Sequence, residues 1–246
     1  MKLVASVICR NELGRYLEPF VGHLLEFVDE ICVLDDSSTD GTTEWLQQNG
    51  VRVMQTVAPT FYSHEGLARQ SLLDWTLEAE PTHIVALDAD EFVTDGHALR
   101  QACEADQGKG AWAVGIDEVW RADESHLHIR TDGGWGLQSR SPLLYRVPEQ
   151  LGTDWRIMDR ALACGREPLA VRKIRATPVD ATVLHFGWAR EHERAARYQR
   201  YVEHDSGKFH ARAHLDSIMW TDARVKLRAR PWPAALEPWK QAILGS

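Results

Sequence analysis

Apolar and polar positions alternate along the first hundred residues in a pattern that predicts strands separated by helices. Short apolar runs cover residues 3–9, 30–34, 51–57 and 83–87, and each is typical of a β-strand. Apolar residues recur at helical spacing over 16–28, and 42–48 and 65–77 are also predicted to be helical. Strands that alternate with helices at this spacing indicate a mostly parallel sheet flanked by helices, which is an α/β fold.

The pattern changes after residue 110. We expect a strand over 112–120, one arm of a hairpin over 126–131 and a glycine-rich loop over 132–136. A helix is predicted over 154–163, one or two strands over 171–186, and a long charged helix over 189–203. The sequence therefore predicts a main domain over 1–187 and a helical C-terminal extension over 188–246.

Polar side chains follow three of the predicted strands, at the point where each strand ends. Arg10 follows the first strand, the pair Asp35 and Asp36 ends the second, and the run from Asp88 to Glu91 follows the fourth. In open parallel sheets, ligands bind beyond the carboxyl ends of the strands. We therefore expect these residues to meet in a single active site.

Asp88 and Asp90 form a D-x-D pair directly after a buried strand, and they are candidate ligands of a metal ion. Mg²⁺ and Mn²⁺ prefer oxygen ligands and often bridge to phosphate oxygens. His185, at the end of a later apolar run, could complete the coordination through a ring nitrogen. A metal held in this way would neutralise charge that develops on a departing diphosphate.

Composition and charge narrow the class of protein. Hydrophobic residues make up 44% and charged residues 26% of the 246 residues, which is typical of a globular protein and excludes a disordered or fibrous chain. No apolar run reaches the roughly 18 residues that a membrane span requires. The four cysteines are far apart, so we expect free thiols and a cytoplasmic protein rather than a zinc site or disulfides.

The net charge of −8 is unevenly distributed. Residues 187–246 carry 11 basic and 7 acidic side chains, although acidic residues outnumber basic ones in the whole chain by 36 to 28. The overall sign argues against nucleic-acid binding. A solvated helical face is the simpler explanation of the basic tail, and contact with a phosphate-bearing partner or the inner face of a membrane is the alternative.

Four segments resemble the family 2 glycosyltransferases, which have a GT-A fold. The segment 34–42, with sequence L-D-D-S-S-T-D-G-T, resembles the family's V-D-D-G-S-T-D-G-T, and 66–70 resembles its G-x-A-x-A-R-N stretch. Residues 88–90 match the D-x-D, and 154–165 resembles the segment that carries the catalytic base. Glu91 extends the metal motif to D-A-D-E-F, as in a bacterial subgroup. The resemblance covers roughly residues 2–187.

This resemblance implies an inverting glycosyltransferase that uses a nucleoside-diphosphate sugar, with a UDP-sugar favoured, and Mn²⁺ or Mg²⁺. Residues 1–110 would be the donor half of the domain and residues 111–187 the acceptor half. By position, Asp154 would be the catalytic base and Asp90 and His185 would bind the metal. The nucleotide-sugar would contact a further set of residues, namely Arg10, Asp35, Asp36, Arg69, Asp88 and Ala89.

Several assignments stay open. Thr153 replaces the acidic residue that precedes the base in the family, so Asp159, Asp117 and Glu118 are also candidates for the role of Asp154. Glu91, Trp135 and Trp188 are candidates for contact with the acceptor or for a lid, since flat rings pack against the apolar faces of sugars.

The acceptor would be a glycan, a lipid-linked molecule or another compound with a hydroxyl group, and surface glycan synthesis is the expected setting. A nucleotidyltransferase and a non-catalytic nucleotide-sugar-binding module are the two competing functions. The first usually carries a glycine- and lysine-rich phosphate loop, and the segment 10–14 is no such loop.

Overall fold

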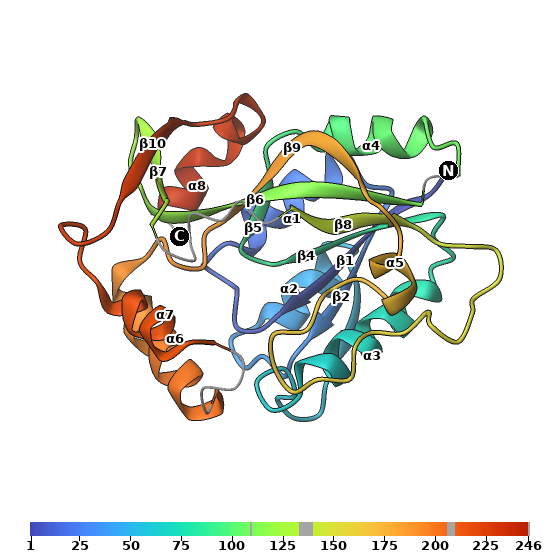
Figure 1. Cartoon of the computed structure of the whole chain (residues 1–246), viewed down its shortest axis with the longest axis horizontal. Helices are drawn as coiled ribbons and strands as arrows, with labels where there is room; N and C mark the ends of the chain where they lie inside the picture. Colours follow the sequence, from blue (N-terminus) through green and yellow to red (C-terminus); the bar gives the residue numbers. More distant parts are fainter. Residues whose placement is uncertain (109, 133–139, 206–209, 246) are drawn as a thin grey trace.

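The computed structural model describes residues 1–108, 110–132, 140–205 and 210–245. Its centre is a sheet in which four parallel strands lie side by side in the order β4-β1-β2-β3 (Figure 1). These strands are β1 (Leu3–Cys9), β2 (Glu30–Asp35), β3 (Arg52–Gln55) and β4 (His83–Asp88). All four lie within two residues of the predicted bounds, and the α/β fold is confirmed.

The sheet continues beyond β4 through antiparallel strands. Next to β4 come β8 (Arg140–Arg146), β6 (Ala111–Ala122), β7 (His126–Arg130) and β10 (Leu227–Pro231). The short strand β5 (Glu91–Val93) pairs with β9 (Thr177–His185), and β9 also runs parallel to β6. The hairpin arm predicted over 126–131 is therefore β7, paired with β6.

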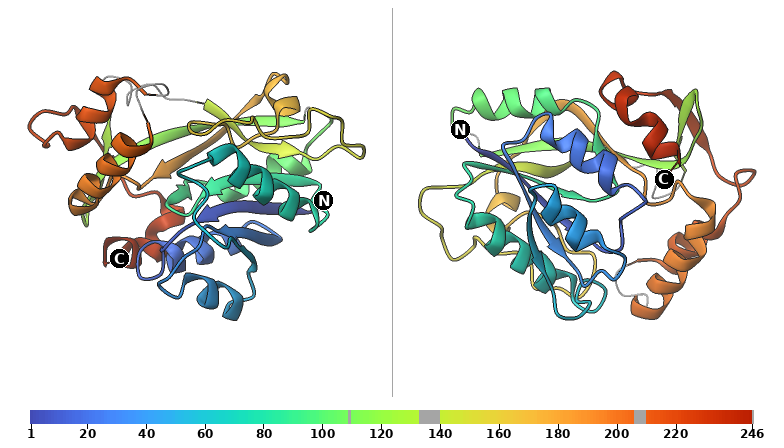
Figure 2. Two further views of the ribbon diagram at one scale, coloured as in Figure 1. Left: turned by 90° about the horizontal axis from the view of Figure 1, so that it is seen from below. Right: turned by 180° about the vertical axis from the view of Figure 1, so that it is seen from behind.

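Helices cover both faces of the parallel strands because β1 is apolar on both faces. Alternate residues from Leu3 to Cys9 pack with α1 (Leu17–Leu25) and α2 (Thr42–Gln48). The residues between them face α3 (Glu65–Leu77): Ile8 packs with Ala68, and the Ser6 and Thr76 hydroxyls lie 2.9 Å apart. Figure 2 shows α3 and the pair α1 and α2 on opposite sides of the sheet. The helix α4 (Gly96–Glu104) packs along β9.

The prediction of a helix over 154–163 is wrong. This segment forms turns, and the first helix after it is the single turn α5 (Leu169–Arg172). Its backbone is engaged elsewhere: the carbonyl groups of Arg160 and Ala161 accept hydrogen bonds from the first amides of α3. A carbonyl used in this way does not close the i to i+4 bond of its own helix.

The C-terminal extension contains three α-helices, which are α6 (Glu191–His204), α7 (Arg212–Asp216) and α8 (Lys240–Gly245). It also contains two 3₁₀ helices, η2 (Ser217–Met219) and η3 (Ala234–Trp239). The strand β10 belongs to the extension too, and the sequence pattern did not predict it. The strand β10 joins the sheet beside β7, whereas α6 lies next to the carboxyl ends of the parallel strands (Figure 1). The extension therefore adds both an edge to the sheet and a wall beside the predicted active site.

Candidate active site

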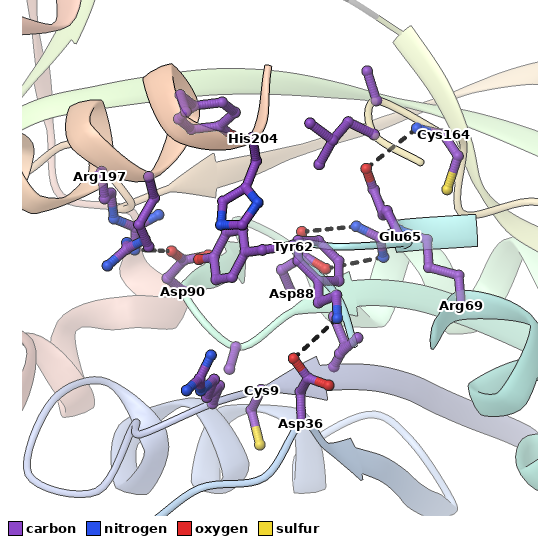
Figure 3. Close-up of a pocket in the computed structure, with 18 of the residues that line it drawn as sticks. Cys9, Asp36, Tyr62, Glu65, Arg69, Asp88, Asp90, Cys164, Arg197 and His204 are labelled. Atoms are coloured by element: carbon purple, nitrogen blue, oxygen red, sulfur yellow. Dashed lines mark hydrogen bonds and ion pairs between the residues drawn. The ribbon is translucent and has the colours of Figure 1, made fainter. Parts of the chain in front are cut away.

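A cavity of about 290 Å³ opens at the carboxyl ends of β1, β2 and β4 (Figure 3). The strand ends supply its floor, and α3, the segment 162–166 and α6 supply its walls. The polar and aromatic residues that line it are Arg10, Glu12, Asp36, Phe61, Tyr62, Glu65, Arg69, Asp88, Asp90, Arg166, His185, Arg197, Arg200, Tyr201, His204 and His210. The three strand ends that the sequence pattern singled out therefore converge on one cavity.

Asp88 lies between two arginines at the end of β4. Arg69 on α3 donates from Nη1 to Asp88 Oδ1 over 3.2 Å, and Arg166 donates from Nη2 to Oδ2 over 2.8 Å. Burial alone would raise the pKa of Asp88, but Arg166 and then Arg69 outweigh it and lower the pKa. Glu65 completes the group by accepting from Arg69 Nε over 2.7 Å. Asp88 is thus held as a carboxylate in one orientation.

Glu91, the acidic residue that extends the D-x-D, is not among the residues that line this cavity. Its side chain is 1% exposed and forms a two-pronged ion pair with Arg166. It also accepts a hydrogen bond from the backbone amide of Asp88 over 2.9 Å. In this arrangement Glu91 fixes the turn that carries Asp88, and it has no surface available for an acceptor.

Asp90 and His185 meet at the cavity wall. Asp90 Oδ1 lies 3.5 Å from His185 Nε2, and the other ring nitrogen, Nδ1, lies 2.5 Å from Glu118 Oε2. Arg197 on α6 donates from Nη2 to Asp90 Oδ2 over 2.8 Å. Burial would lower the pKa of His185, but Glu118 and Asp90 raise it overall.

Asp36 binds the loop that follows β3. Its carboxylate accepts from the backbone amides of Thr60 and Phe61, over 2.7 and 3.1 Å. The neighbouring Asp35 is fully buried and does not line the cavity, because it bonds to the Ser38 amide and to the Thr43 hydroxyl. Asp36 therefore shapes the cavity wall, and Asp35 holds the turn before α2.

Two arginines face the cavity without a carboxylate partner. Arg10 and Arg200 both line it, and within the described residues neither has an acidic side chain within 4.0 Å. In both, the Nε atom is buried and makes no hydrogen bond. The cavity is thus lined by two arginines that form no ion pair with another described residue.

The predicted bases lie outside the cavity. The Asp154 side chain is 49% exposed and pairs with Lys173, whose hydrogen bond lowers the pKa of Asp154. Asp159 pairs with His64 at the surface. The role of Asp154 as the catalytic base therefore remains a prediction from the sequence.

Asp117 and Glu118, which are also candidates for the base, are engaged in ion pairs. Asp117 is bound by Arg228 and Arg230 of the extension, and Glu118 is bound by His185.

Of the two tryptophans that are candidates for acceptor contact or a lid, the described residues include only Trp188. Trp188 is 6% exposed and packs with Trp120 in a small core beneath α6, so it does not reach the cavity. Its ring meets His185 edge-on, with centroids 6.1 Å apart. Trp135 lies outside the described residues.

Sequence reasoning missed the contribution of α6. Cavity-lining residues recur on this helix at i, i+3, i+4 and i+7, namely Arg197, Arg200, Tyr201 and His204. This spacing places them on one face of the helix. This spacing can be seen in the sequence. However, a helix face that mixes charged and aromatic residues is also typical of an ordinary solvated helix, so the spacing alone did not indicate a binding site.

Asp90 and His185 could hold a divalent metal ion in place of the proton that His185 carries in this arrangement, since ligating histidines are neutral. A carboxylate oxygen and a ring nitrogen face each other, and Glu118 takes the second ring nitrogen, as outer carboxylates do for histidine ligands. Within the described residues, no group of three or more His, Cys, Asp or Glu side chains forms a ready-made site. Any further ligands would therefore be water or phosphate oxygens, which is usual for Mg²⁺.

A comparison with protein-family models matches residues 5–162 to Glycosyl transferase family 2. This is more than half of the chain, so the protein belongs to that family and is a glycosyltransferase. The match covers the parallel strands and the D-x-D, and it ends before β9 and α6. Family membership supports glycosyl transfer over nucleotidyl transfer and over a non-catalytic module.

Solved structures share the fold. S. aureus TarS residues 1–349 superimposes with a TM-score of 0.52 at 18% identity, covering 89% of this chain and 69% of that one. The same fragment in complex with UDP gives a TM-score of 0.51 at 18% identity, covering 89% and 70%.

A more distant structure is glucosyl-3-phosphoglycerate synthase from Mycobacterium tuberculosis, in complex with Mn²⁺ and UDP-glucose. It gives a TM-score of 0.36 at 21% identity, covering 48% of this chain and 43% of that one. The chain spans 42% of the longer TarS chain.

A search of the curated proteins found no matching sequence. Among the described residues, no helix is long and apolar enough to cross a membrane.

Proposed function

We propose that this enzyme transfers a sugar from a nucleoside-diphosphate sugar to an acceptor hydroxyl, with a divalent metal ion and inversion at the anomeric carbon. The observation that carries the proposal is the convergence of Asp36, Asp88, Asp90 and His185 on one cavity at the ends of the parallel strands. A UDP-sugar is the favoured donor, since the similar TarS fragment was solved with UDP. Surface glycan synthesis is the proposed setting.

The donor would lie along the strand ends. Asp36 and the loop it holds would contact the nucleoside, with Ala89 and Asp88 near the ribose. Arg69 and Arg166 keep Asp88 ionised and fixed, which suits a residue that binds hydroxyl groups through both oxygens. Arg10 supplies a positive charge for the diphosphate.

Asp90 and His185 would hold Mn²⁺ or Mg²⁺. When bound, the metal would supply positive charge to the leaving diphosphate. Glu118 orients the imidazole so that Nε2 faces Asp90, and Arg197 balances the carboxylate charge on the other oxygen. These contacts support the proposal, because they hold the two candidate ligands side by side.

Asp154 is the proposed general base. Its ion pair with Lys173 keeps the Asp154 carboxylate ionised, as a general base must be. Because Asp154 lies outside the cavity, the acceptor hydroxyl would have to approach the donor from the side on which Asp154 lies. We expect Asp154→Asn to lower kcat by about 10²–10⁴-fold and to leave the Kd for donor unchanged. Transfer at the wild-type rate would reassign the base, and Asp159→Asn, Asp117→Asn and Glu118→Gln in the same assay would locate it.

The test of the donor and metal is a thermal-shift screen followed by turnover. We expect UDP to raise the Tm in the presence of Mn²⁺ and to have little effect with excess chelator. Asp90→Asn with His185→Ala should remove the Mn²⁺-dependent part of the shift. Mass spectrometry of a panel of nucleotide sugars then identifies the donor by its slow hydrolysis.

Equal shifts with and without chelator would contradict the metal site. Failure of every nucleoside diphosphate to bind would contradict the proposed function.

A further inference from the structure

Helix α6 of the C-terminal extension faces the cavity with two arginines in different electrostatic situations. Arg197 is committed to Asp90 through its ion pair. Arg200 lies three residues further along the same face of the helix, and its guanidinium lies 5.2 Å from the centre of the Tyr62 ring. It has no acidic partner among the described residues, and its Nε atom is buried without a hydrogen bond.

The two arginines lie against different residues of the cavity wall. Arg197 sits at Asp90, the carboxylate of the proposed metal site. Arg200 sits at Tyr62, which directly follows the residue whose backbone amide binds Asp36, at the proposed nucleoside end. In a nucleotide sugar the diphosphate follows the nucleoside, so in the proposed binding mode it would lie between the loop held by Asp36 and the proposed metal ligand Asp90.

Contacts at both ends of α6 hold the helix in this position. The ring of His204 stacks on that of Tyr62, with centroids 6.1 Å apart and planes inclined by 22° (Figure 3). At the other end, Arg194 is buried and bonds to the backbone carbonyl groups of Trp188 and Trp120. The helix is thus fixed at both ends, and the arginine between them is not left to fluctuate freely in solvent.

We propose that Arg200 binds the diphosphate of the donor, so that the C-terminal extension completes the substrate site of the family domain. This inference rests on the proposed function. A guanidinium has five N–H donors in a planar fork that matches phosphate oxygens, and it stays charged at any physiological pH. The family match ends at residue 162, so α6 adds a group that the matched segment does not contain.

The test compares binding of UDP with binding of uridine by calorimetry, because only UDP carries the phosphates. In Arg200→Gln we expect the Kd for UDP to rise about tenfold or more, as for loss of a hydrogen bond to a charged group, while the Kd for uridine stays unchanged. Arg200→Lys should retain part of the affinity for UDP. If the donor screen favours another base, that nucleoside and its diphosphate replace uridine and UDP.

Arg212→Gln is the matched control. Arg212 lies on α7 of the same extension, its side chain is 64% exposed and it pairs with Asp216. We expect this variant to bind UDP as the wild type does. The Tm of each variant without ligand shows whether the fold is retained.

Two results would overturn the inference while leaving the proposed function intact. UDP affinity at the wild-type level in Arg200→Gln would do so, and if the KM for the acceptor rose instead, Arg200 would bind a phosphate on the acceptor. An equal loss of uridine affinity would mean that Arg200 shapes the nucleoside end through Tyr62. In contrast, a wild-type protein that binds no nucleoside diphosphate would remove the proposed function itself.

Discussion

At the scale of single residues, Gly66 lies where the backbone of another segment leaves no room for a side chain. It is the first residue of the segment 66–70 that resembles the family pattern, and it lies in the first turn of α3. Its amide donates to the carbonyl of Arg160 over 2.9 Å, and a Cβ at this position would overlap the backbone of Met158 and Arg160. The glycine lets the turn-forming segment cross the helix at the cavity wall.

We therefore expect Gly66→Ala to lower the free energy of unfolding by about 1–3 kcal/mol, because the obstacle is backbone and cannot rotate away. Urea denaturation measures the loss. Gly152→Ala is the control, since nothing lies within 4 Å of a Cβ placed there. Similar midpoints for the two variants would show that the segment 158–160 can shift without cost.

At the scale of secondary-structure elements, the helices begin in different ways. Helix α4 has a side-chain cap, in which Asp95 accepts from the Ala98 amide over 2.9 Å. Helix α2 is preceded at its N-cap position by Gly41, which has φ at 94° and provides no side-chain cap. Helix α3 is capped by His64 and by the carbonyl groups of the segment 160–161.

Loss of the cap on α4 should be measurable. We expect Asp95→Ala to destabilise the protein by about 1 kcal/mol, the usual value for an N-cap residue. Asp180→Ala removes the same charge from an exposed position on β9 and should be close to neutral. If both variants unfold at the same urea concentration, the cap contributes nothing to the stability of the whole fold.

At the scale of the whole molecule, buried histidines couple stability to pH. His23 is 1% exposed and packs against the rings of Phe27 and Phe92, and His83 is 5% exposed beside Trp112. Burial lowers the pKa of both, although Glu26 and Asp106 act in the opposite direction. The unfolded chain therefore binds protons at about pH 6.5, before the folded chain does.

It follows that the stability these histidines contribute is complete above about pH 6.5 and is lost as the pH falls below it. Between pH 6.5 and 5.5 we expect each of these histidines to lower the free energy of unfolding, measured by urea denaturation, by up to about 1.4 kcal/mol per pH unit, while Glu12, whose pKa burial raises to about 8, acts in the opposite direction. His23→Leu should flatten this slope, whereas His97→Leu, at an exposed position on α4, should not. An unchanged slope in His23→Leu would assign the effect to other groups.

The sequence pattern predicted the parallel half of the fold more closely than the rest. The strands β1, β2 and β4 are continuous apolar runs whose signal is local, and α3 matches its predicted bounds. The error at 154–163 arose because its apolar spacing is helical, whereas its backbone bonds go to α3. Hydrogen bonds between segments so far apart in the sequence cannot be predicted from the residue pattern of either segment alone.

The candidate site divides in the same way. Residues at strand ends, such as Asp36, Asp88 and Asp90, were predictable because the topology of a parallel sheet brings strand ends together. Arg166 and Arg200 come from a turn and from a helix beyond the main domain, and only the folded chain shows that they reach the cavity. The sequence shows that these residues are charged, but it does not show that their side chains line the cavity.

The packing of Trp232, Leu236 and Ile243 into the same hydrophobic core as Leu17 and Phe20 has a consequence for how the protein is made. A ribosome synthesises the parallel strands first, but the part of α1 that contacts η3 and α8 stays uncovered until more than 200 further residues have been added. Contacts so distant along the chain slow folding and expose apolar surface meanwhile. A chaperone that shields this surface until α8 has been synthesised would therefore favour correct folding of the enzyme.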